Sequence, residues 1–282
     1  MNIQARKKLL RYFETKASAQ TFGVLEKFFK IIGQDPAPLE VSSECGQRGG
    51  RDYVRLALSC LRRDQVLELF SQTNHKQAVE EFMLANHDDP CFGMGIADYG
   101  SGCDEQRTKL YNYYDLLKNK TLWKDHLIEL CRKTGISWQD VERDIDYFKE
   151  VQMSAVDFYD HGEVHLKVYF GPFPSQDILT KFLNLFNAQA VKQYRKWLDG
   201  ESLSQLALLC IRYAPQGRSI RTDFWCQARH IVPYLREFDL QGDAVRLYKD
   251  LCAISTNQVL TFICVDMDQR PRTQFYFLLD NL

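Results

Sequence analysis

The stretch FGMGIADYGSGCDEQRTKLYNY, residues 92–113, contains two strand-like segments separated by a turn that contains glycine. Side chains alternate across a β-strand, so Arg107, Lys109 and Tyr111 point to one side while the residues between them point to the other. Two cations and a phenol on one face require polar surroundings there. The stretch therefore predicts a β-hairpin whose two faces have different environments.

This hairpin pattern occurs five times along the chain. The paired segments are PLEVSSEC with DYVRLALSC, FGMGIADY with QRTKLYNY, SAVDFYD with EVHLKVYF, LALLCIRYA with SIRTDFWC, and QVLTFICVDM with RTQFYFLL. Each break between partners contains Gly or Pro, which tight turns favour. Polar residues of the second strands recur about every 55 residues, at Arg55, Lys109, Lys167, Arg221 and Gln274.

This spacing predicts one domain, residues 1–282, built from five repeats. The expected repeats are approximately 1–90, 91–150, 151–200, 201–254 and 255–282. Apolar residues with a helical period predict helices between or before the hairpins, within Ile3–Ile32, Asp64–Asn86, Leu116–Phe148, Gln176–Leu198 and Ala228–Ala253.

Hairpins alone leave unpaired edges and an uncovered apolar face. Closing ten antiparallel strands into a barrel inside a ring of helices removes both problems. An open sheet of that size is less favourable because strand twist curls it. We therefore expect an α+β fold with a single closed barrel.

The overall composition limits the classes of function. The 282 residues include 36 Lys and Arg against 37 Asp and Glu, so the net charge of −1 gives no general attraction to nucleic acid or acidic lipid. The nine Cys form no Cys-x-x-Cys pair, which argues against a zinc site or a disulfide framework. No apolar run has the length of a membrane span and the N-terminus lacks a signal-peptide pattern, so we expect a cytoplasmic protein.

Two further hairpins place polar side chains on a single face in the same way: His165, Lys167 and Tyr169, and Arg272, Gln274 and Tyr276. In one isolated hairpin such a face is usually solvated. Its repetition favours the lumen of a barrel, because helices outside would cover the apolar face. Clustered cations inside a barrel repel each other unless an anion lies between them, and a diphosphate is a suitable anion.

The order and spacing of these motifs resemble the aromatic prenyltransferases of the ABBA (αββα) barrel fold. The closer resemblance is to the cyanobactin prenyltransferases, which attach isoprenoids to ribosomal macrocyclic peptides. It rests on LEVSSEC with Glu40, on Arg55, and on TKLY, LKVY and RTQFYF. It covers the whole chain and implies transfer from dimethylallyl or geranyl diphosphate to a cyclic or linear peptide, with Mg²⁺ paired to the diphosphate.

The resemblance also implies roles for individual residues. Glu40 corresponds to the base that contacts the acceptor, and Arg55 to an arginine that binds diphosphate. The expected diphosphate ligands are Arg55, Lys109, Lys167, Arg221 and Gln274, with Arg107, Arg212 and Arg272 as weaker candidates. The expected aromatic shield around the allyl cation is Tyr111, Tyr169, Tyr213 and Tyr276.

Three polar residues are candidates for contacting the acceptor: Asp98, Asp157 and His165. Surface or turn roles are more common for such acids. In the fourth hairpin Arg212 and Tyr213 are adjacent, so only one can face the lumen, and Arg218 or Arg221 are the alternative cations. No dedicated metal-binding motif is present.

Three other functions remain open at this point. The barrel could prenylate small aromatic molecules, carry isoprenoid diphosphates without catalysis, or bind nucleic acid, which the balanced charge disfavours. The sequence leaves open the acceptor side chain, a five- or ten-carbon donor, and forward or reverse attachment. We expect a monomer.

Overall fold

The computed structural model describes residues 3–33, 39–45, 54–84, 91–98, 107–116, 122–182, 192, 203–227, 243–254, 259–266 and 273–279. At some of these positions, among them Arg55, Gln274 and Tyr276, it describes the backbone alone.

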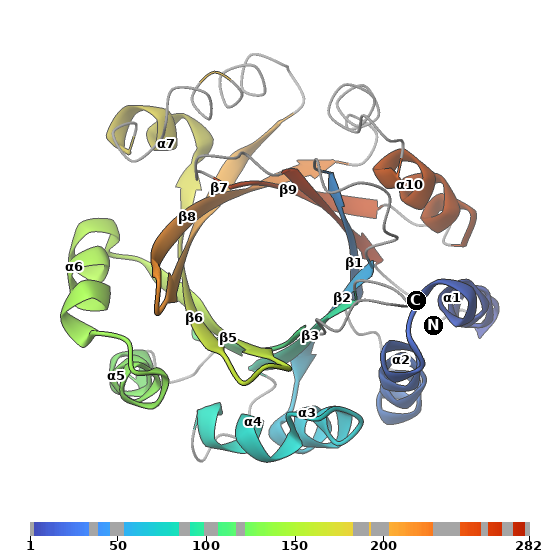
Figure 1. Cartoon of the computed structure of the whole chain (residues 1–282). Helices are drawn as coiled ribbons and strands as arrows, with labels where there is room; N and C mark the ends of the chain where they lie inside the picture. The colour runs from blue at the N-terminus through green and yellow to red at the C-terminus, as the bar shows by residue number, and fades with distance from the viewer. Residues whose placement is uncertain are drawn as a thin grey trace.

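The strands in this part of the chain form a closed barrel (Figure 1). They are β1 Leu39–Cys45, β2 Val54–Leu61, β3 Phe92–Asp98, β4 Arg107–Tyr113, β5 Val151–Tyr159, β6 Val164–Pro174, β7 Leu203–Ala214, β8 Gly217–Gln227, β9 Val259–Asp266 and β10 Thr273–Leu279. Each strand pairs antiparallel with its chain neighbours, and β1 closes the ring by pairing with β10 from Leu39↔Leu279 to Cys45↔Thr273. The predicted antiparallel barrel inside a ring of helices is confirmed, and the alternative of an open sheet is wrong.

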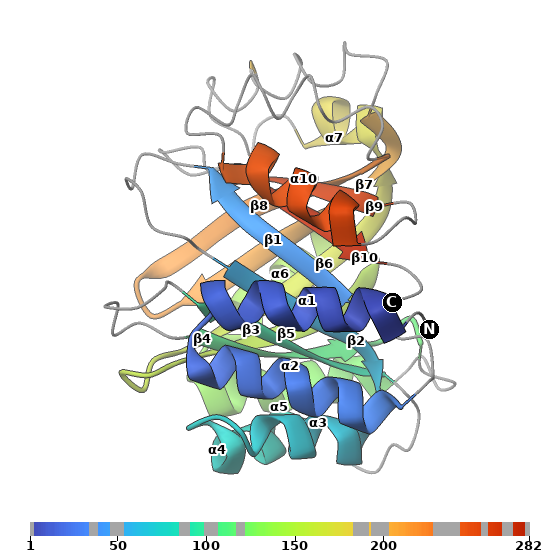
Figure 2. The ribbon, with the colours of Figure 1, turned by 90° about the vertical axis from the view of Figure 1, so that its right-hand side faces the viewer.

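Helices surround the barrel on the outside (Figures 1 and 2). They are α1 Ile3–Lys16, α2 Ala19–Ile32, α3 Arg63–Phe70, α4 Lys76–Phe82, α5 Leu122–Thr134, α6 Trp138–Phe148, α7 Ser175–Lys181 and α10 Asp243–Ile254. Figure 2 shows α1 and α2 side by side over the outer surface. Within the described residues, no helix has both the length and the hydrophobicity required to cross a membrane.

Two of the regions predicted to contain helices are each divided into two helices, and the second helix begins at a serine cap. Ser18 begins α2, where its Oγ accepts a hydrogen bond from the backbone N–H of Thr21. Gly135, with a φ of +71°, separates α5 from α6, and Ser137 then caps α6. These caps satisfy backbone donors that the first helical turn leaves unpaired.

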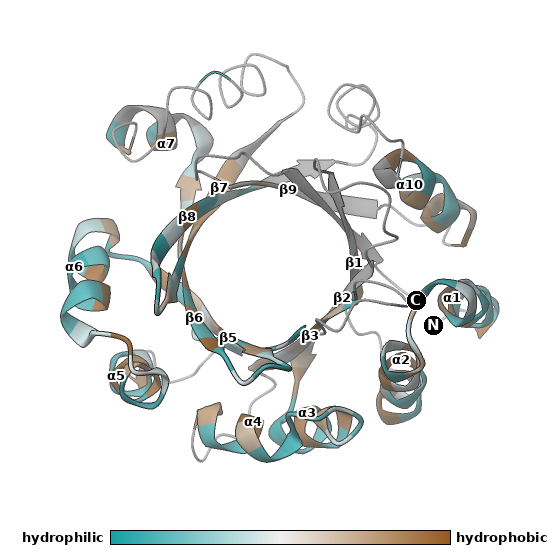
Figure 3. Cartoon of the chain, in the orientation of Figure 1, coloured by the Kyte–Doolittle hydropathy of each residue, from teal (hydrophilic) through white to brown (hydrophobic). Residues whose placement is uncertain are grey.

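The hydrophobic core lies between the strands and the helices. On the strands it contains Leu110, Val156, Leu166 and Ile211, all with exposed fractions of 0 %. On α6 the buried positions Val141, Asp144, Ile145 and Phe148 follow the spacing of one helix face. In Figure 3 the helices α3, α5 and α6 each show hydrophobic and hydrophilic portions, as helices with one buried face require.

The register shifts at a few points in the barrel. Shifts occur between Leu58 and Leu61 in β2, Val151 and Met153 in β5, Phe170 and Phe173 in β6, and Leu203 and Ala207 in β7. The ladders that join β4 to β3 and β5 run without a shift. Side chains therefore alternate strictly between lumen and helices along β4.

Two residues predicted for the lumen lie on the outer face instead. Tyr213 donates a hydrogen bond of 2.8 Å to Asp144 of α6, and Arg218 also donates to Asp144. Asp98 accepts a hydrogen bond of 2.6 Å from the backbone N–H of Ser18 at the start of α2. The predicted shielding role of Tyr213 and acceptor role of Asp98 are therefore corrected, because alternation along β7 and β3 turns both side chains toward the helices.

The Tyr213–Asp144 hydrogen bond predicts a specific loss of stability. Replacing Tyr213 with Phe removes one of two donors to a buried carboxylate, so the free energy of unfolding should fall by about 1–3 kcal/mol. Urea denaturation followed by circular dichroism measures it. The control is Tyr147→Phe, whose hydroxyl bonds a backbone carbonyl at the surface, and it should change the free energy by less than about 0.5 kcal/mol. Equal effects of the two substitutions would contradict the proposed role of the hydrogen bond.

Candidate active site in the barrel lumen

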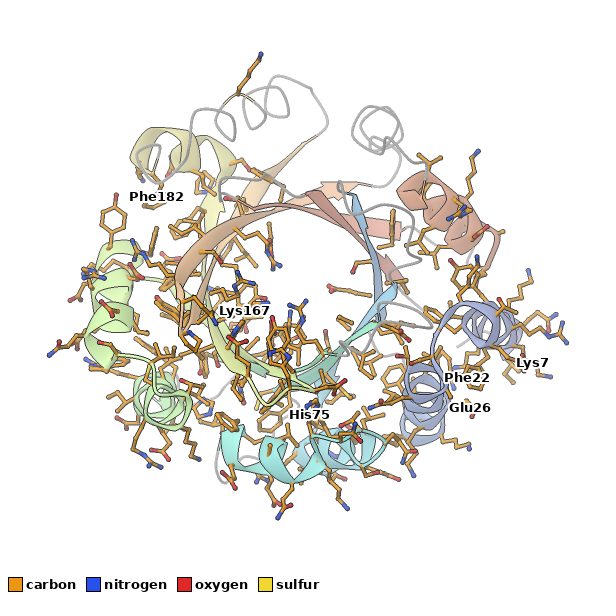
Figure 4. The ribbon with its side chains drawn as sticks, in the orientation of Figure 1. Lys7, Phe22, Glu26, His75, Lys167 and Phe182 are labelled. Atoms are coloured by element: carbon orange, nitrogen blue, oxygen red, sulfur yellow. The ribbon has the colours of Figure 1, made fainter. Side chains whose placement is uncertain are left out.

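The side chains predicted to converge in the lumen do so around one buried carboxylate. Asp157 on β5 is fully buried, and its oxygens lie 2.6 Å from Lys167 Nζ, 3.3 Å from Arg107 Nη1 and 3.6 Å from Lys109 Nζ. The two lysines are only 2 % and 4 % exposed. Figure 4 shows Lys167 on the inner side of the barrel wall, whereas His75 lies between the wall and the surrounding helices. The prediction that Arg107, Lys109 and Lys167 share one lumen site is confirmed in position.

The proximity of these groups determines their charges. Burial alone would raise the pKa of Asp157, but Lys109, Lys167 and Arg107 together hold it well below its usual range. Burial lowers the pKa of Lys167 to about 8, and Asp157 partly offsets that effect. Three cationic side chains thus meet at one carboxylate.

The fourth hairpin contributes a second charged pair to the lumen. Arg221 on β8 donates to Asp223 at 2.7 Å, and its guanidinium lies 5.9 Å from the centre of the Tyr169 ring. Arg212 on β7 is the register partner of Lys167. Arg212 and Arg221 therefore take inner positions and Arg218 lies outside, and which of the inner cations binds diphosphate stays a prediction.

Aromatic rings line the wall next to the cations. Tyr111 stacks on Tyr113 with centroids 5.9 Å apart and planes inclined by 13°. The ammonium of Lys109 lies 5.2 Å from the Tyr111 ring centre, so this ring face already contacts a cation. Tyr111 and Tyr169 belong to one buried cluster in the lumen, which confirms their predicted position.

Two glycines on β3 make room for these rings. A Cβ at Gly93 would lie 3.0 Å from the Tyr113 hydroxyl and 2.7 Å from the Leu58 carbonyl oxygen. A Cβ at Gly95 would lie 3.2 Å from Lys109 Cβ and 3.3 Å from Tyr111 Cε2. The rings therefore lie close against the barrel wall, which larger residues on β3 would prevent.

Glu40 occupies the same row of the barrel as the cation cluster. Register pairs link Glu40 to Ala57, Ala57 to Gly95, Gly95 to Lys109 and Lys109 to Asp157. Its neighbours in sequence, Leu39 and Val41, belong to the outer hydrophobic core, so alternation turns Glu40 inward. Small residues on β2 and β3 separate it from Lys109.

Glu40 also acts on the aromatic wall. Burial first, then the neighbouring Tyr111 and to a smaller degree Glu40, raise the pKa of Tyr113 well above its usual value. The Tyr113 hydroxyl lies 2.9 Å from Ser59 Oγ. Tyr113 therefore stays neutral, with a hydroxyl oriented by Ser59.

The remaining predicted acceptor contacts have identifiable partners. His165 Nε2 lies 2.7 Å from Glu163, which also contacts His161 Nε2 at 2.9 Å and the Gln216 side chain at 2.8 Å. His165 thus belongs to a polar group beside the β5–β6 turn. Asp157 forms ion pairs with Arg107, Lys109 and Lys167, and its role in binding an acceptor stays a prediction.

The structure does not describe the side chains of four residues that the sequence predicted for the lumen. Arg272 lies outside the described residues. The backbones of Arg55, Gln274 and Tyr276 occupy β2 and β10, where Arg55 pairs with Ser42 and Tyr276 also pairs with Ser42. Their diphosphate-binding and shielding roles stay predictions.

The described lumen does not suit a metal held by protein ligands. Asp157 accepts a hydrogen bond from Lys167 and forms ion pairs with Arg107 and Lys109. Protonated lysine and arginine side chains have no lone pairs available for Mg²⁺. No group of three or more potential ligands gathers elsewhere in the described ranges. We therefore derive no step through a metal ion.

Several site residues were missed by sequence reasoning. Tyr113 could have been predicted, because it continues the inward alternation of β4. The glycines of FGMG could also have been predicted as points of close approach, since a glycine inside a strand often has that role. By contrast, no local sequence pattern indicated that Asp157 pairs with cations of the neighbouring strands or that Asp223 pairs with Arg221.

The fold matches solved structures over nearly the whole chain. The 5-dimethylallyl tryptophan synthase from Streptomyces coelicolor, in complex with DMASPP and Trp, has a TM-score of 0.61 and 12 % identity, with 96 % of this chain and 93 % of that chain covered. A 6-dimethylallyl tryptophan synthase has a TM-score of 0.65 and 10 % identity, with 98 % and 96 % covered. NotF in complex with brevianamide F and DMSPP has a TM-score of 0.60 and 13 % identity, with 100 % and 96 % covered.

The sequence itself matches no family model and no curated protein. At identities this low, the structural similarity establishes the fold and leaves activity to be argued from the site. The narrower resemblance to cyanobactin prenyltransferases has no counterpart among these three neighbours. The chain has the ABBA barrel fold that these aromatic prenyltransferases share.

Proposed function

We propose that this protein is a prenyltransferase that transfers an isoprenyl group from an allylic diphosphate to a small aromatic acceptor. The observation that carries the proposal is the convergence of Arg107, Lys109 and Lys167 beside stacked tyrosines inside a closed barrel. Converging cationic side chains suit a polyanion, and ring faces suit the carbocation that forms when this anion leaves.

The first step is cleavage of the bond between the allylic carbon and the diphosphate oxygen. The diphosphate departs with the electron pair, so negative charge grows on its oxygens in the transition state. Lys109, Lys167 and Arg107 donate hydrogen bonds to that charge in surroundings of low dielectric, which lowers the barrier. The organic fragment becomes an allyl cation.

The second step is attack on that cation by a carbon of the acceptor ring. Tyr111, Tyr113 and Tyr169 present ring faces to the lumen, where they stabilise positive charge and occupy space that water would otherwise fill. A new carbon–carbon bond forms, and the ring must then lose a proton. Glu40 accepts this proton, because alternation turns its carboxylate into the lumen, in the same row of the barrel as Lys109.

The acceptor is the part of the proposal that differs from the sequence-based prediction. The cyanobactin resemblance favoured a macrocyclic peptide. The solved neighbours of the same fold contain Trp or brevianamide F, which supports a small aromatic acceptor instead. The alternative of a non-catalytic carrier shares the cation cluster but has no use for a base at Glu40.

The activity can be tested directly. The protein is incubated with dimethylallyl or geranyl diphosphate and with tryptophan, indole-containing dipeptides, phenols or cyclic peptides, and products are detected by mass spectrometry. We expect a mass increase of one isoprenyl group on an aromatic acceptor. Prenylation of cyclic peptides alone would favour the peptide alternative, and diphosphate binding without any product would favour the carrier.

Lys167 should be required for donor ionisation. Replacing it with Gln removes one donor to the leaving diphosphate, and kcat/KM should fall by about 100-fold or more. The control is Lys124→Gln on the exposed surface of α5, where the lysine pairs with Glu142 at 3.4 Å, and it should leave kcat/KM unchanged. Equal activity of the two variants would show that the cluster does not bind the donor.

Glu40 should be required for proton removal but not for donor binding. Glu40→Gln keeps the size of the side chain and removes its basicity, so kcat should fall by about 100- to 10,000-fold. The dissociation constant for inorganic diphosphate, measured by calorimetry, should change by less than about twofold. The control is Glu26→Gln on the outer surface of α2 (Figure 4). Wild-type turnover in Glu40→Gln would reassign the base.

A further inference from the structure

Asp157 is an unexpected residue to find in a site for an anionic substrate. It is fully buried, and Lys167, Arg107 and Lys109 all direct charged groups at it. An incoming diphosphate would meet a carboxylate of its own sign and would need the same N–H donors. The proposed function has no chemical step for this residue.

Its presence solves a different problem. Three cations buried together repel one another and lose hydration. Asp157 supplies an opposite charge from within the barrel wall. It also holds the amino group of Lys167 in place, because Lys167 Nζ donates to it at 2.6 Å.

We propose that Asp157 is a positioning residue of the donor site, which occupies the place of the diphosphate while the donor is absent and keeps Lys167 charged for its arrival. The inference rests on the proposed function, since it assumes that the cluster receives a diphosphate. Asp157 acts through the cations and has no part in the bonds that form or break.

The groups around Asp157 and Lys167 define the expected pH dependence. Arg107 and Lys109 face Asp157 from β4, and His165 on β6 is its register partner. Burial lowers the pKa of His165 below 6.5, although its hydrogen bond to Glu163 opposes this. His165 is therefore mostly neutral above pH 6.5.

Lys167 is the neighbour whose charge changes between pH 6.5 and 8.5. Its pKa is lowered to about 8 by burial, and Asp157 opposes that decrease whereas Arg107 and Arg221 add to it. Two residues of β7 also lie near Lys167. Cys210 opposes the decrease in the pKa of Lys167, and Arg212 is the register partner of Lys167. Without Asp157 the pKa of Lys167 falls further, so a larger fraction of the amine is neutral at pH 7–8. Only the protonated amine attracts diphosphate.

Asp157→Asn tests this by calorimetric titration with inorganic diphosphate at pH 6.5 and pH 8.5. At pH 6.5 the variant should bind at least as tightly as the wild type, because the competing carboxylate is gone. From pH 6.5 to 8.5 the ratio of the variant's dissociation constant to that of the wild type should rise several-fold, because the lower pKa leaves a smaller fraction of the Lys167 amine protonated at the higher pH. Protonation of diphosphate itself cancels in this ratio.

A matched control uses the other buried carboxylate of the lumen. Asp223→Asn makes the same chemical change and removes the partner of Arg221. The ratio of its dissociation constant for diphosphate to that of the wild type should not depend on pH. Asp157→Glu restores the charge and should return the ratio toward the wild-type value at both pH values. Circular dichroism establishes that each variant is folded.

The outcomes separate the inference from the proposed function. The positioning role is overturned if the ratio of dissociation constants for Asp157→Asn and the wild type is the same at both pH values. It is also overturned if Asp157→Asn binds diphosphate more weakly than the wild type at pH 6.5. Asp157 would then be a structural residue. A wild-type protein that binds no diphosphate at either pH overturns the proposed function itself, and the positioning role with it.

Discussion

A closed sheet surrounded by helices has one face in the hydrophobic core and one face in the lumen, and the strict alternation of side chains assigns every strand residue to one of them. Leu110 and Leu166 pack under the helices, while their neighbours Lys109 and Lys167 meet across the lumen at Asp157. The hydrophobic layer that stabilises the fold therefore lies outside the wall. The inner face is released from that requirement, and it can hold charged and aromatic residues at fixed separations.

Charges buried in this way must be balanced before any substrate arrives. Asp157 balances three cations from β4 and β6, and Asp223 balances Arg221 within β8. Each carboxylate belongs to the same wall as its partners, so the pairs form when the strands align. The convergence of three cations on Asp157 distinguishes this cluster from a simple ion pair, and the adjacent stack of Tyr111 and Tyr113 places ring faces beside it.

The parts of the structure that could be predicted from the sequence are those determined by local pattern. Alternation over a few residues was sufficient to identify the hairpins and to place Lys109, Lys167, Tyr111 and Tyr169 inside the barrel. Local pattern could not show which of the adjacent residues Arg212 and Tyr213 faces the lumen. The structure shows that Tyr213 faces outward, where it donates a hydrogen bond to Asp144 of α6. The role of Asp157 was also out of reach, since it depends on cations contributed by two flanking strands. Asp98 was misplaced for the same reason, because its partner Ser18 is distant in sequence.

The unshifted ladders of β4 have a consequence for how this protein tolerates changes in length. Inserting or deleting one residue within Arg107–Tyr113 would invert the phase of every position beyond it, and would exchange charged side chains with leucine and threonine across the wall. The register shifts in β2, β5, β6 and β7 can absorb such changes locally. Homologues should therefore vary in length at those shifts and at hairpin turns, and retain a constant count of residues along β4.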